Sequence, residues 1–402
     1  MSLPSAAIAR RIAAGAATLA LLLLAACGDS AGPDGGGGGA TLSGTIRAAG
    51  SSEALADATV SIGARQASSD ANGQFELTDV PTGAVTARAV RPGYLPAEDA
   101  ITMSAGANSH DFTLTVREIY VSGTDAVYVP GDVGPMRGAI VVLGGPVTSG
   151  FVTGERLTPA GSSPELEQSL QALGASLRAL AHSAHVALLG SRTTGLVNSA
   201  TSDNALFAAL TTAAQLSGHA EIADVPVLTF GLSAGGPEAA GLVSRNPDRA
   251  IGLLERVPVS VTSLTAPAAL AVPTFVMQAE LDNVVDNSAV RTTFLQNRLR
   301  GGLWALAVEP GVGHHEASSR GNGAAINWIA GALQLRLPTT AGEPLIALDQ
   351  PSGWLGNQTT LEIAPWADYS GGRTTASWLL SESQASSWKS LGTPKSTDGG
   401  GV

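Results

Sequence analysis

The chain has 402 residues, of which 44% are hydrophobic and 14% are charged. This much apolar material can build two compact domains and excludes a disordered polymer. Lys and Arg number 22 against 33 Asp and Glu, which gives a formal charge of -11, so no basic face for nucleic acid is expected. The single Cys excludes an intramolecular disulfide.

The first 26 residues have the pattern of a secretory signal peptide. Arg10 and Arg11 precede an apolar run that continues to Ala26, and no acidic residue interrupts it. The run ends in LAA before Cys27, which resembles the bacterial lipobox, where cleavage precedes a Cys that is then acylated. The resemblance implies lipidation of Cys27 and attachment to the cell envelope. We expect the outer membrane, because Gly28 stands where lipoproteins of the inner membrane usually carry Asp.

The alternative for Cys27 is a free thiol in an amino-terminal membrane anchor. Against it, the apolar run of about 15 residues is shorter than the roughly 20 residues that span a bilayer.

Two segments lack any apolar periodicity. Residues 27–40 read CGDSAGPDGGGGGA and predict a flexible tether. Residues 392–402 predict a disordered tail.

Residues 41–117 carry short apolar runs that turn residues separate. The runs cover 41–46, 58–62, 74–77, 85–90 and 111–116. This spacing predicts an antiparallel β-sandwich of about seven strands.

The same segment resembles the carboxypeptidase regulatory-like, transthyretin-type domain. The matching residues are SGTI at 43–46, ATV at 58–60, DANGQF at 70–75, VPTG at 80–83 and PGY at 92–94. The resemblance implies an accessory module. We expect a spacer or docking role, and binding of a glycan or partner is the alternative.

Residues 118–391 show an α/β rhythm, in which short β-branched runs alternate with segments of helical length. We expect strands at 139–143, 185–189, 225–230, 273–277 and 303–308, and helices at 164–181, 203–216, 237–246 and 322–333.

The strand at 225–230 leads into the motif Gly231-Leu232-Ser233-Ala234-Gly235. A G-x-S-x-G match by itself is weak in a chain with 49 Gly, so its context decides. A strand before it and a helix after it are the context that a nucleophilic serine on a sharp turn requires. Such a turn also directs the Ala234 N–H toward a developing oxyanion.

A serine nucleophile needs a base and an orienting acid, in the chain order Ser, Asp, His. Asp282 follows the strand at 273–277, and His314 follows the strand at 303–308 after a Gly-rich loop. We expect each of the two intervals, Ser233 to Asp282 and Asp282 to His314, to hold about one α/β crossover.

Together these features resemble the α/β-hydrolase fold over residues 118–391. The resemblance implies Ser233 as nucleophile, Asp282 as acid and His314 as base, and it implies no cofactor. The oxyanion hole is expected from Ala234 and the loop after residue 143. Gly145 is the first choice there and Val147 the second, because Pro146 has no N–H.

Other assignments stay open. Glu280 and Asp286 compete with Asp282 as the acid, and His315 competes with His314 as the base. His182, His185 and His219 are expected to be structural. A zinc site is not expected, because the adjacent His314 and His315 lack a spaced third ligand.

Four of the six Trp lie beyond the hydrolase core, at 354, 366, 378 and 388. We expect their indoles to pack against the hydrolase body, and a hydrophobic lip at the mouth of the active site is the alternative.

The sequence therefore predicts an exported, lipid-anchored serine hydrolase that acts on small or polymeric carboxylic esters. One alternative is a noncatalytic surface binding protein on a degenerate hydrolase scaffold, and another is a serine peptidase.

Overall fold

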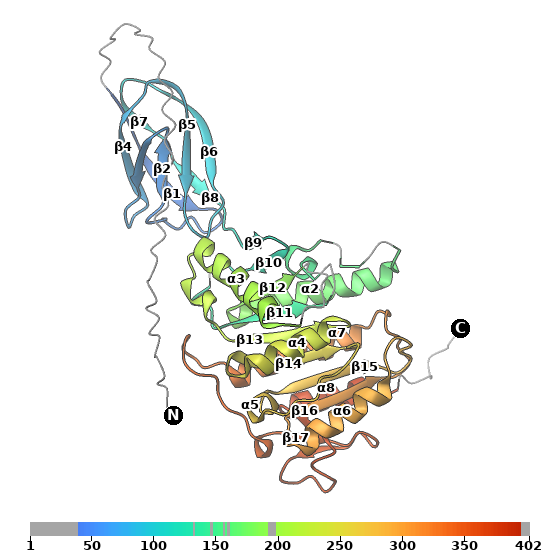
Figure 1. Ribbon diagram of the computed structural model, residues 1–402. Coiled ribbons are helices and arrows are strands. Elements are labelled where there is room, and N and C mark those ends of the chain that lie inside the picture. The colour runs from blue at the N-terminus through green and yellow to red at the C-terminus, as the bar shows by residue number, and fades with distance from the viewer. Residues whose placement is uncertain are drawn as a thin grey trace, which may run out of the picture. The chain divides into compact units, whose positions relative to one another are not determined.

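The computed structural model describes residues 39–394 apart from 132, 145–147, 156, 159–160 and 192–197. The expected signal peptide, the lipidation residue Cys27, most of the tether and residues 395–402 lie outside the described residues. Within the described part, an all-β region is followed along the chain by an α/β region (Figure 1). No helix of the described part is long and apolar enough to cross a membrane.

The all-β region consists of two packed sheets. One has the order β4-β1-β7, with β8 also paired to β1, and the other has the order β3-β2-β5-β6. Inward side chains such as Leu42, Val60 and Phe75 form its core. The strands are β1 (Ala40–Ala48), β2 (Thr59–Ile62), β3 (Arg65–Ser68), β4 (Gln74–Val80), β5 (Gly83–Val90), β6 (Ala97–Met103), β7 (Gly106–Ser109) and β8 (Phe112–Leu114).

The expectation of a purely antiparallel sandwich is wrong in one respect. Strand β1 pairs in parallel with both β7 and β8. The cause is that β5 and β6 lie in the other sheet, so the chain returns to the first sheet running in the direction of β1. The β3, β6 and β7 strands were not among the expected runs, because their residues are mostly polar or exposed.

The α/β region is built on an eight-stranded sheet of order β16-β15-β14-β13-β11-β12-β10-β9. Only pairs that involve β10 are antiparallel. The strands are β9 (Ile119–Ser122), β10 (Asp125–Tyr128), β11 (Gly138–Leu143), β12 (Val186–Ser191), β13 (Val227–Leu232), β14 (Ala250–Arg256), β15 (Thr274–Ala279) and β16 (Trp304–Glu309). An order that reverses at β11 and β12 with an antiparallel second strand is the α/β-hydrolase arrangement.

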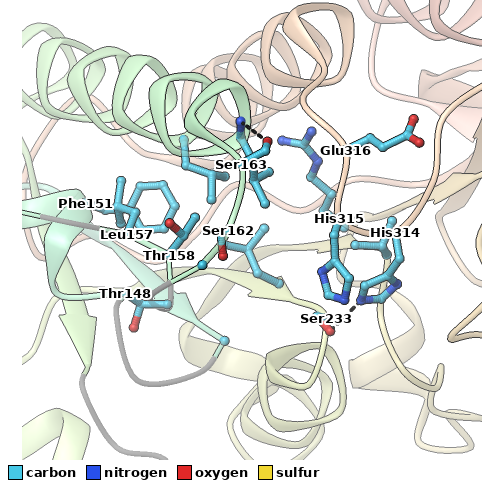
Figure 2. A pocket seen from close by; sticks show the side chains of 17 residues that line it. Thr148, Phe151, Leu157, Thr158, Ser162, Ser163, Ser233, His314, His315 and Glu316 are labelled. Carbon is cyan, nitrogen blue, oxygen red and sulfur yellow. Dashed lines mark hydrogen bonds between the residues drawn. The ribbon is translucent and has the colours of Figure 1, made fainter.

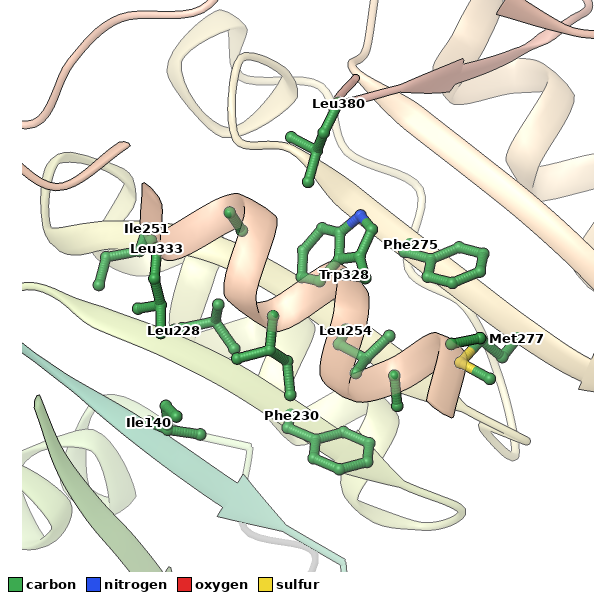
Figure 3. Close-up of a cluster of buried hydrophobic side chains, with 14 of the residues drawn as sticks. Ile140, Leu228, Phe230, Ile251, Leu254, Phe275, Met277, Trp328, Leu333 and Leu380 are labelled. Atoms are coloured by element: carbon green, nitrogen blue, oxygen red, sulfur yellow. The ribbon is translucent and has the colours of Figure 1, made fainter. Parts of the chain in front are cut away.

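Helices cover both faces of this sheet and bury its apolar strands. The α2, α7 and α8 helices pack on one face, and α3 and α4 pack on the other. Figure 3 shows Trp328 of α7 beside Phe275 of the sheet, with ring centroids 6.2 Å apart. The helices are α1 (Gly150–Thr153), α2 (Pro164–Ala184), α3 (Ala200–Ser217), α4 (Gly235–Arg245), α5 (Pro267–Leu270), α6 (Asn287–Leu299), α7 (Ser319–Arg336) and α8 (Glu382–Gly392), with 3-10 turns at Ala220–Ala223, Pro247–Arg249 and Gln350–Ser352.

The expected crossover count is wrong between Ser233 and Asp282. That interval contains α4, β14, α5 and β15, which makes two crossovers rather than one. The interval from Asp282 to His314 holds α6 and β16, which is one. Strand β14 was missed because its apolar run is short and ends in Glu255 and Arg256, a pattern that periodicity cannot distinguish from a helix segment.

The carboxyl-terminal extension attaches to edge strand β16. It forms a small sheet of β17 (Trp354–Gly356), β18 (Ile363–Pro365) and β19 (Ser377–Leu379), followed by α8. The Trp388 indole N–H donates to the Leu306 carbonyl at 2.6 Å, and Ser377 Oγ accepts from the Leu306 N–H at 2.9 Å. Trp378 and Trp388 are buried, so the extension packs its indoles against the hydrolase body.

Candidate active site

Ser233 lies on a tight turn between β13 and α4. Its φ of +49° is in the left-handed region, which is uncommon for a residue with a side chain and signals backbone strain. The turn depends on flanking glycines, since a Cβ at Gly231 would lie 2.6 Å from Gly236 Cα, and one at Gly235 would lie 2.2 Å from the Leu143 carbonyl. The strained turn therefore presents Ser233 at the carboxyl edge of the sheet.

His314 and Asp282 meet Ser233 at this edge. Ser233 Oγ lies 2.8 Å from His314 Nε2, and His314 Nδ1 lies 2.8 Å from Asp282 Oδ2. The side chains of His314 and Asp282 are 2% and 0% exposed, so bulk water does not compete for the second contact. The three residues come from loops after three different parallel strands, which end at the same edge of the sheet.

Asp282 is held as a carboxylate by its surroundings. Burial raises the pKa of its carboxyl, but hydrogen bonds from His314 and from the Val284 and Val285 N–H groups outweigh burial, so the pKa is lowered. The two backbone N–H groups donate to Oδ1 at 2.9 and 3.0 Å. These contacts leave Oδ2 for His314, which fixes the orientation of the imidazole.

The competing candidates have other partners. Glu280 accepts a hydrogen bond from the Gly311 N–H at 2.8 Å, and Asp286 caps α6 by accepting from Ser288 and Ala289. The His315 ring is exposed and meets the His314 ring edge-on at a centroid distance of 4.6 Å. Of the histidines expected to be structural, His219 contacts Glu221, with Nδ1 2.9 Å from Oε1.

The oxyanion-hole candidates are only partly described. Ala234 directly precedes α4, so its N–H lies at the positive end of the helix. No acceptor for this N–H is found among the described residues. Gly145 and Val147 lie outside the described residues, and the neighbouring Gly144 lines the cavity at Ser233.

A cavity of about 570 Å³ opens beside Ser233 and His314. Figure 2 shows Phe151, Leu157 and Thr158 across this space from Ser233. Its described lining combines apolar and polar side chains, which suits a ligand with an apolar body and a few polar groups. None of the four Trp of the extension is among the described residues that line it.

Sequence reasoning missed two charged residues at the end of β14. Glu255 is 0% exposed, both of its carboxylate oxygens lack a partner among the described residues, and burial raises the pKa of Glu255 well above its usual value. Arg256 lines the cavity beside Ser233. Both were hidden because the strand that carries them was not recognised.

The described residues contain no cluster of three or more His, Cys, Asp or Glu side chains that could hold a metal ion. The groups that meet at Ser233 are a hydroxyl, an imidazole and a carboxylate in series.

Comparison with known proteins identifies the all-β region. Residues 41–116 match the carboxypeptidase regulatory-like domain. The regulatory-like domain thus coincides with strands β1–β8. A search of curated proteins finds none that matches the chain.

Several solved structures are similar to parts of the chain. A type II cohesin-X-dockerin complex from Acetivibrio cellulolyticus is 26% identical over 20% of this chain, which spans 60% of that chain, with a TM-score of 0.18. LpqC, a poly(3-hydroxybutyrate) depolymerase from Bordetella parapertussis, is 20% identical over 55% of this chain and 91% of its own, with a TM-score of 0.34. A putative α/β hydrolase from Agrobacterium tumefaciens is 15% identical over 55% of this chain and 99% of its own, with a TM-score of 0.37.

The strand order, the antiparallel β10 and the turn at Ser233 give residues 118–391 the α/β-hydrolase fold. This region is called the hydrolase domain below.

Proposed function

We propose that the protein is a serine hydrolase that cleaves carboxylic esters through an acyl-enzyme. The observation that supports this most directly is the pair of 2.8 Å contacts that link Ser233, His314 and Asp282 in series. A hydroxyl at neutral pH is a weak nucleophile, and an oriented imidazole within hydrogen-bond distance is the group that activates it.

In the acylation step, Ser233 Oγ attacks the ester carbonyl carbon while His314 Nε2 accepts the hydroxyl proton. Asp282 stabilises the resulting imidazolium through Nδ1. The Ala234 N–H donates to the oxyanion of the tetrahedral intermediate, which collapses as His314 gives the proton to the departing alcohol.

In the deacylation step, His314 removes a proton from a water molecule, and the water oxygen attacks the acyl carbon. The second tetrahedral intermediate collapses as the proton returns to Ser233 Oγ, which releases the carboxylic acid and restores the enzyme. The sequence offers no specific site for an amide leaving group, so esters are preferred over peptides as substrates.

A serine-directed phosphonate probe and an aryl ester test this proposal together. Ser233→Ala is expected to lose labelling and to lower kcat by several orders of magnitude with the fold intact, because the nucleophile is gone. Ser244→Ala, on the exposed face of α4, is the matched control and should keep the parental labelling and the parental kcat. Parental rates in Ser233→Ala would contradict the assignment, and no labelling of folded protein would favour a binding protein. Faster amide than ester turnover would favour a peptidase.

We also propose that the protein is exported and anchored to the cell envelope through lipid on Cys27, with the outer membrane as the expected location. The support is the charged, apolar and small-residue order of residues 1–27. Mass spectrometry of the envelope fraction should find the mature amino terminus at Cys27 carrying acyl chains. Cys27→Ser should abolish acylation, and an unmodified Cys27 in the parental protein would contradict the proposal.

A further inference from the structure

Arg256 lies immediately beside the serine turn. It is the last residue of β14 and the register partner of Leu232 at the end of β13. Its carbonyl accepts the Ser233 N–H at 3.0 Å. The side chain lines the same cavity as Ser233 and His314.

Two helices hold the Arg256 guanidinium in place. Nη1 donates to Asn322 Oδ1 of α7 at 2.6 Å. Asn322 Nδ2 in turn donates to the Ser169 carbonyl of α2 at 2.7 Å and to Ser169 Oγ at 3.0 Å. The contact takes up one of the guanidinium nitrogens and leaves Nε and Nη2 without a partner among the described residues.

The positive charge of Arg256 is not matched by a contacting anion. Within the described part of the chain, no carboxylate lies within 4.0 Å of its nitrogens. Burial lowers the pKa of Arg256, and the more distant Glu309 opposes this effect. Glu309 itself is engaged elsewhere, accepting from Ser318 Oγ at 2.5 Å and lying 3.6 Å from Arg320 Nε.

Glu316, the carboxylate among the described residues that line the cavity, does not form an ion pair with Arg256. Glu316 is exposed and accepts a hydrogen bond from the Gly313 N–H at 3.0 Å. Figure 2 shows its carboxylate directed away from Ser233. The cavity therefore offers a fixed cation that has spare donors and no bound counter-charge from the described residues.

We propose that Arg256 is a specificity residue that binds a free carboxylate of the substrate, so that the preferred esters carry a second, anionic carboxylate. This inference rests on the proposed esterase function. A planar guanidinium with two free nitrogens suits a planar carboxylate, and charge-assisted hydrogen bonds are stronger in a partly desolvated cavity. The apolar lining would contact the chain between the two carboxyl groups.

Two pairs of matched esters test the proposal and show which side of the ester carries the carboxylate. Mono-4-nitrophenyl adipate and 4-nitrophenyl hexanoate differ only in a terminal carboxylate or methyl on the acyl side. The 4-(carboxymethyl)phenyl and 4-ethylphenyl hexanoates make the same comparison on the alcohol side. Rates are corrected for spontaneous hydrolysis.

For at least one pair, the parental enzyme should prefer the anionic ester by about 10-fold in kcat/KM, mainly through KM. In Arg256→Gln the ratio should fall to about 1. Asn322→Asp places a competing carboxylate on Arg256 Nη1 and should also lower the ratio of anionic to neutral ester turnover. This variant provides the test if Arg256→Gln does not fold. Equal loss on both esters of a pair would indicate a merely structural Arg256 and overturn the proposal, as would parental ratios at or below 1.

A binding measurement separates this proposal from the esterase function. Titration calorimetry of Ser233→Ala with monomethyl adipate and with methyl hexanoate requires no turnover. Tighter binding of the anionic ester that Arg256→Gln abolishes supports the carboxylate site even if the parental enzyme hydrolyses nothing. Ester hydrolysis by the parent without any carboxylate preference refutes the Arg256 proposal and leaves the esterase function standing.

Discussion

The regulatory-like domain and the hydrolase domain bury different kinds of side chain. In the described part of the regulatory-like domain, the buried polar side chain is Ser69, and no ionisable residue is buried. The hydrolase domain buries Asp203, Glu255, Arg298, Glu309, His314 and Arg336 among others. Burying a charge lowers stability unless partners compensate it. Arg245 compensates Asp203 and backbone carbonyls compensate Arg298, whereas both oxygens of Glu255 lack a partner among the described residues.

The largest effect should come from the buried relay itself. Asp282→Asn should lower kcat by about 10³- to 10⁴-fold, because the amide no longer holds His314 in the tautomer that accepts the Ser233 proton. Steady-state kinetics with an aryl ester measures the loss. The neighbouring Glu280→Gln is the control, since among the described residues the Glu280 carboxylate accepts a hydrogen bond from the Gly311 N–H and does not contact His314. Comparable losses of kcat in both variants would show that any change in this loop lowers activity, which would contradict a specific role for Asp282.

A large effect on stability is expected at Arg298 of α6. The 0% exposed guanidinium donates to the carbonyls of Ala376 and Arg373 at 2.7 and 2.6 Å, and also to that of Gly302. Arg298→Met leaves these carbonyls unpaired and should reduce the free energy of unfolding by about 3–5 kcal/mol. Urea denaturation followed by Trp fluorescence reports this, because all six Trp lie at positions 304–388. Arg291→Ala, on the exposed side of α6, should change it little.

A smaller effect, dependent on pH, is expected at Glu238 of α4. Burial, and then the charge of Asp203, raise the pKa of Glu238 to about 7, against the opposing effect of Arg245. The folded protein therefore holds a proton that the unfolded chain releases near pH 4.5, so this group's contribution to stability falls as the pH rises from about 4.5 through 7. Glu238→Gln should remove that fall and gain about 1 kcal/mol at pH 8, after allowance for solvent screening. A difference between variant and parent that is constant from pH 5 to 8 would contradict this.

An effect of similar size on stability, with none on ester turnover, is expected in the regulatory-like domain. Ser69 Oγ donates to the Leu55 carbonyl at 2.7 Å and accepts from the Ala58 N–H at 3.0 Å. Ser69→Ala should destabilise this domain by about 1 kcal/mol. Hydrogen exchange should speed up in β2 and β4 but not in β13, and ester turnover should stay at the parental rate. A loss of turnover would mean that the accessory domain contributes to catalysis.

The serine turn and the two partners proposed for it can be predicted from the sequence, because their signals are local. A strand followed by G-x-S-x-G and a helix predicts the turn at Ser233. The glycines of the motif indicate that backbone segments pass close to one another there, as they do in the structure. Asp282 and His314 were likewise predicted from their positions in the loops that follow apolar strands. Parallel strands then bring such residues to one edge, whatever their separation along the chain.

The rest depends on contacts between distant segments. Nothing local distinguishes Asp282 from Glu280 or Asp286; the choice is made by which carboxylate the sheet places against His314. Arg256 and Glu255 point to opposite faces of β14, so neither role can be predicted before the strand itself is known. The parallel pairing of β1 likewise follows from which sheet each later strand joins.

The extension has a bearing on solubility. Strand β16 ends the hydrolase sheet, and an open edge of this kind is a template for pairing with another molecule. At the middle of that edge, the Leu306 N–H donates to Ser377 Oγ. The Leu306 carbonyl accepts from the side chains of Gln358 and Trp388. We expect a chain truncated after α7, which lacks residues 337–402, to keep every residue of the proposed relay and yet to aggregate, because the edge of β16 would then be open.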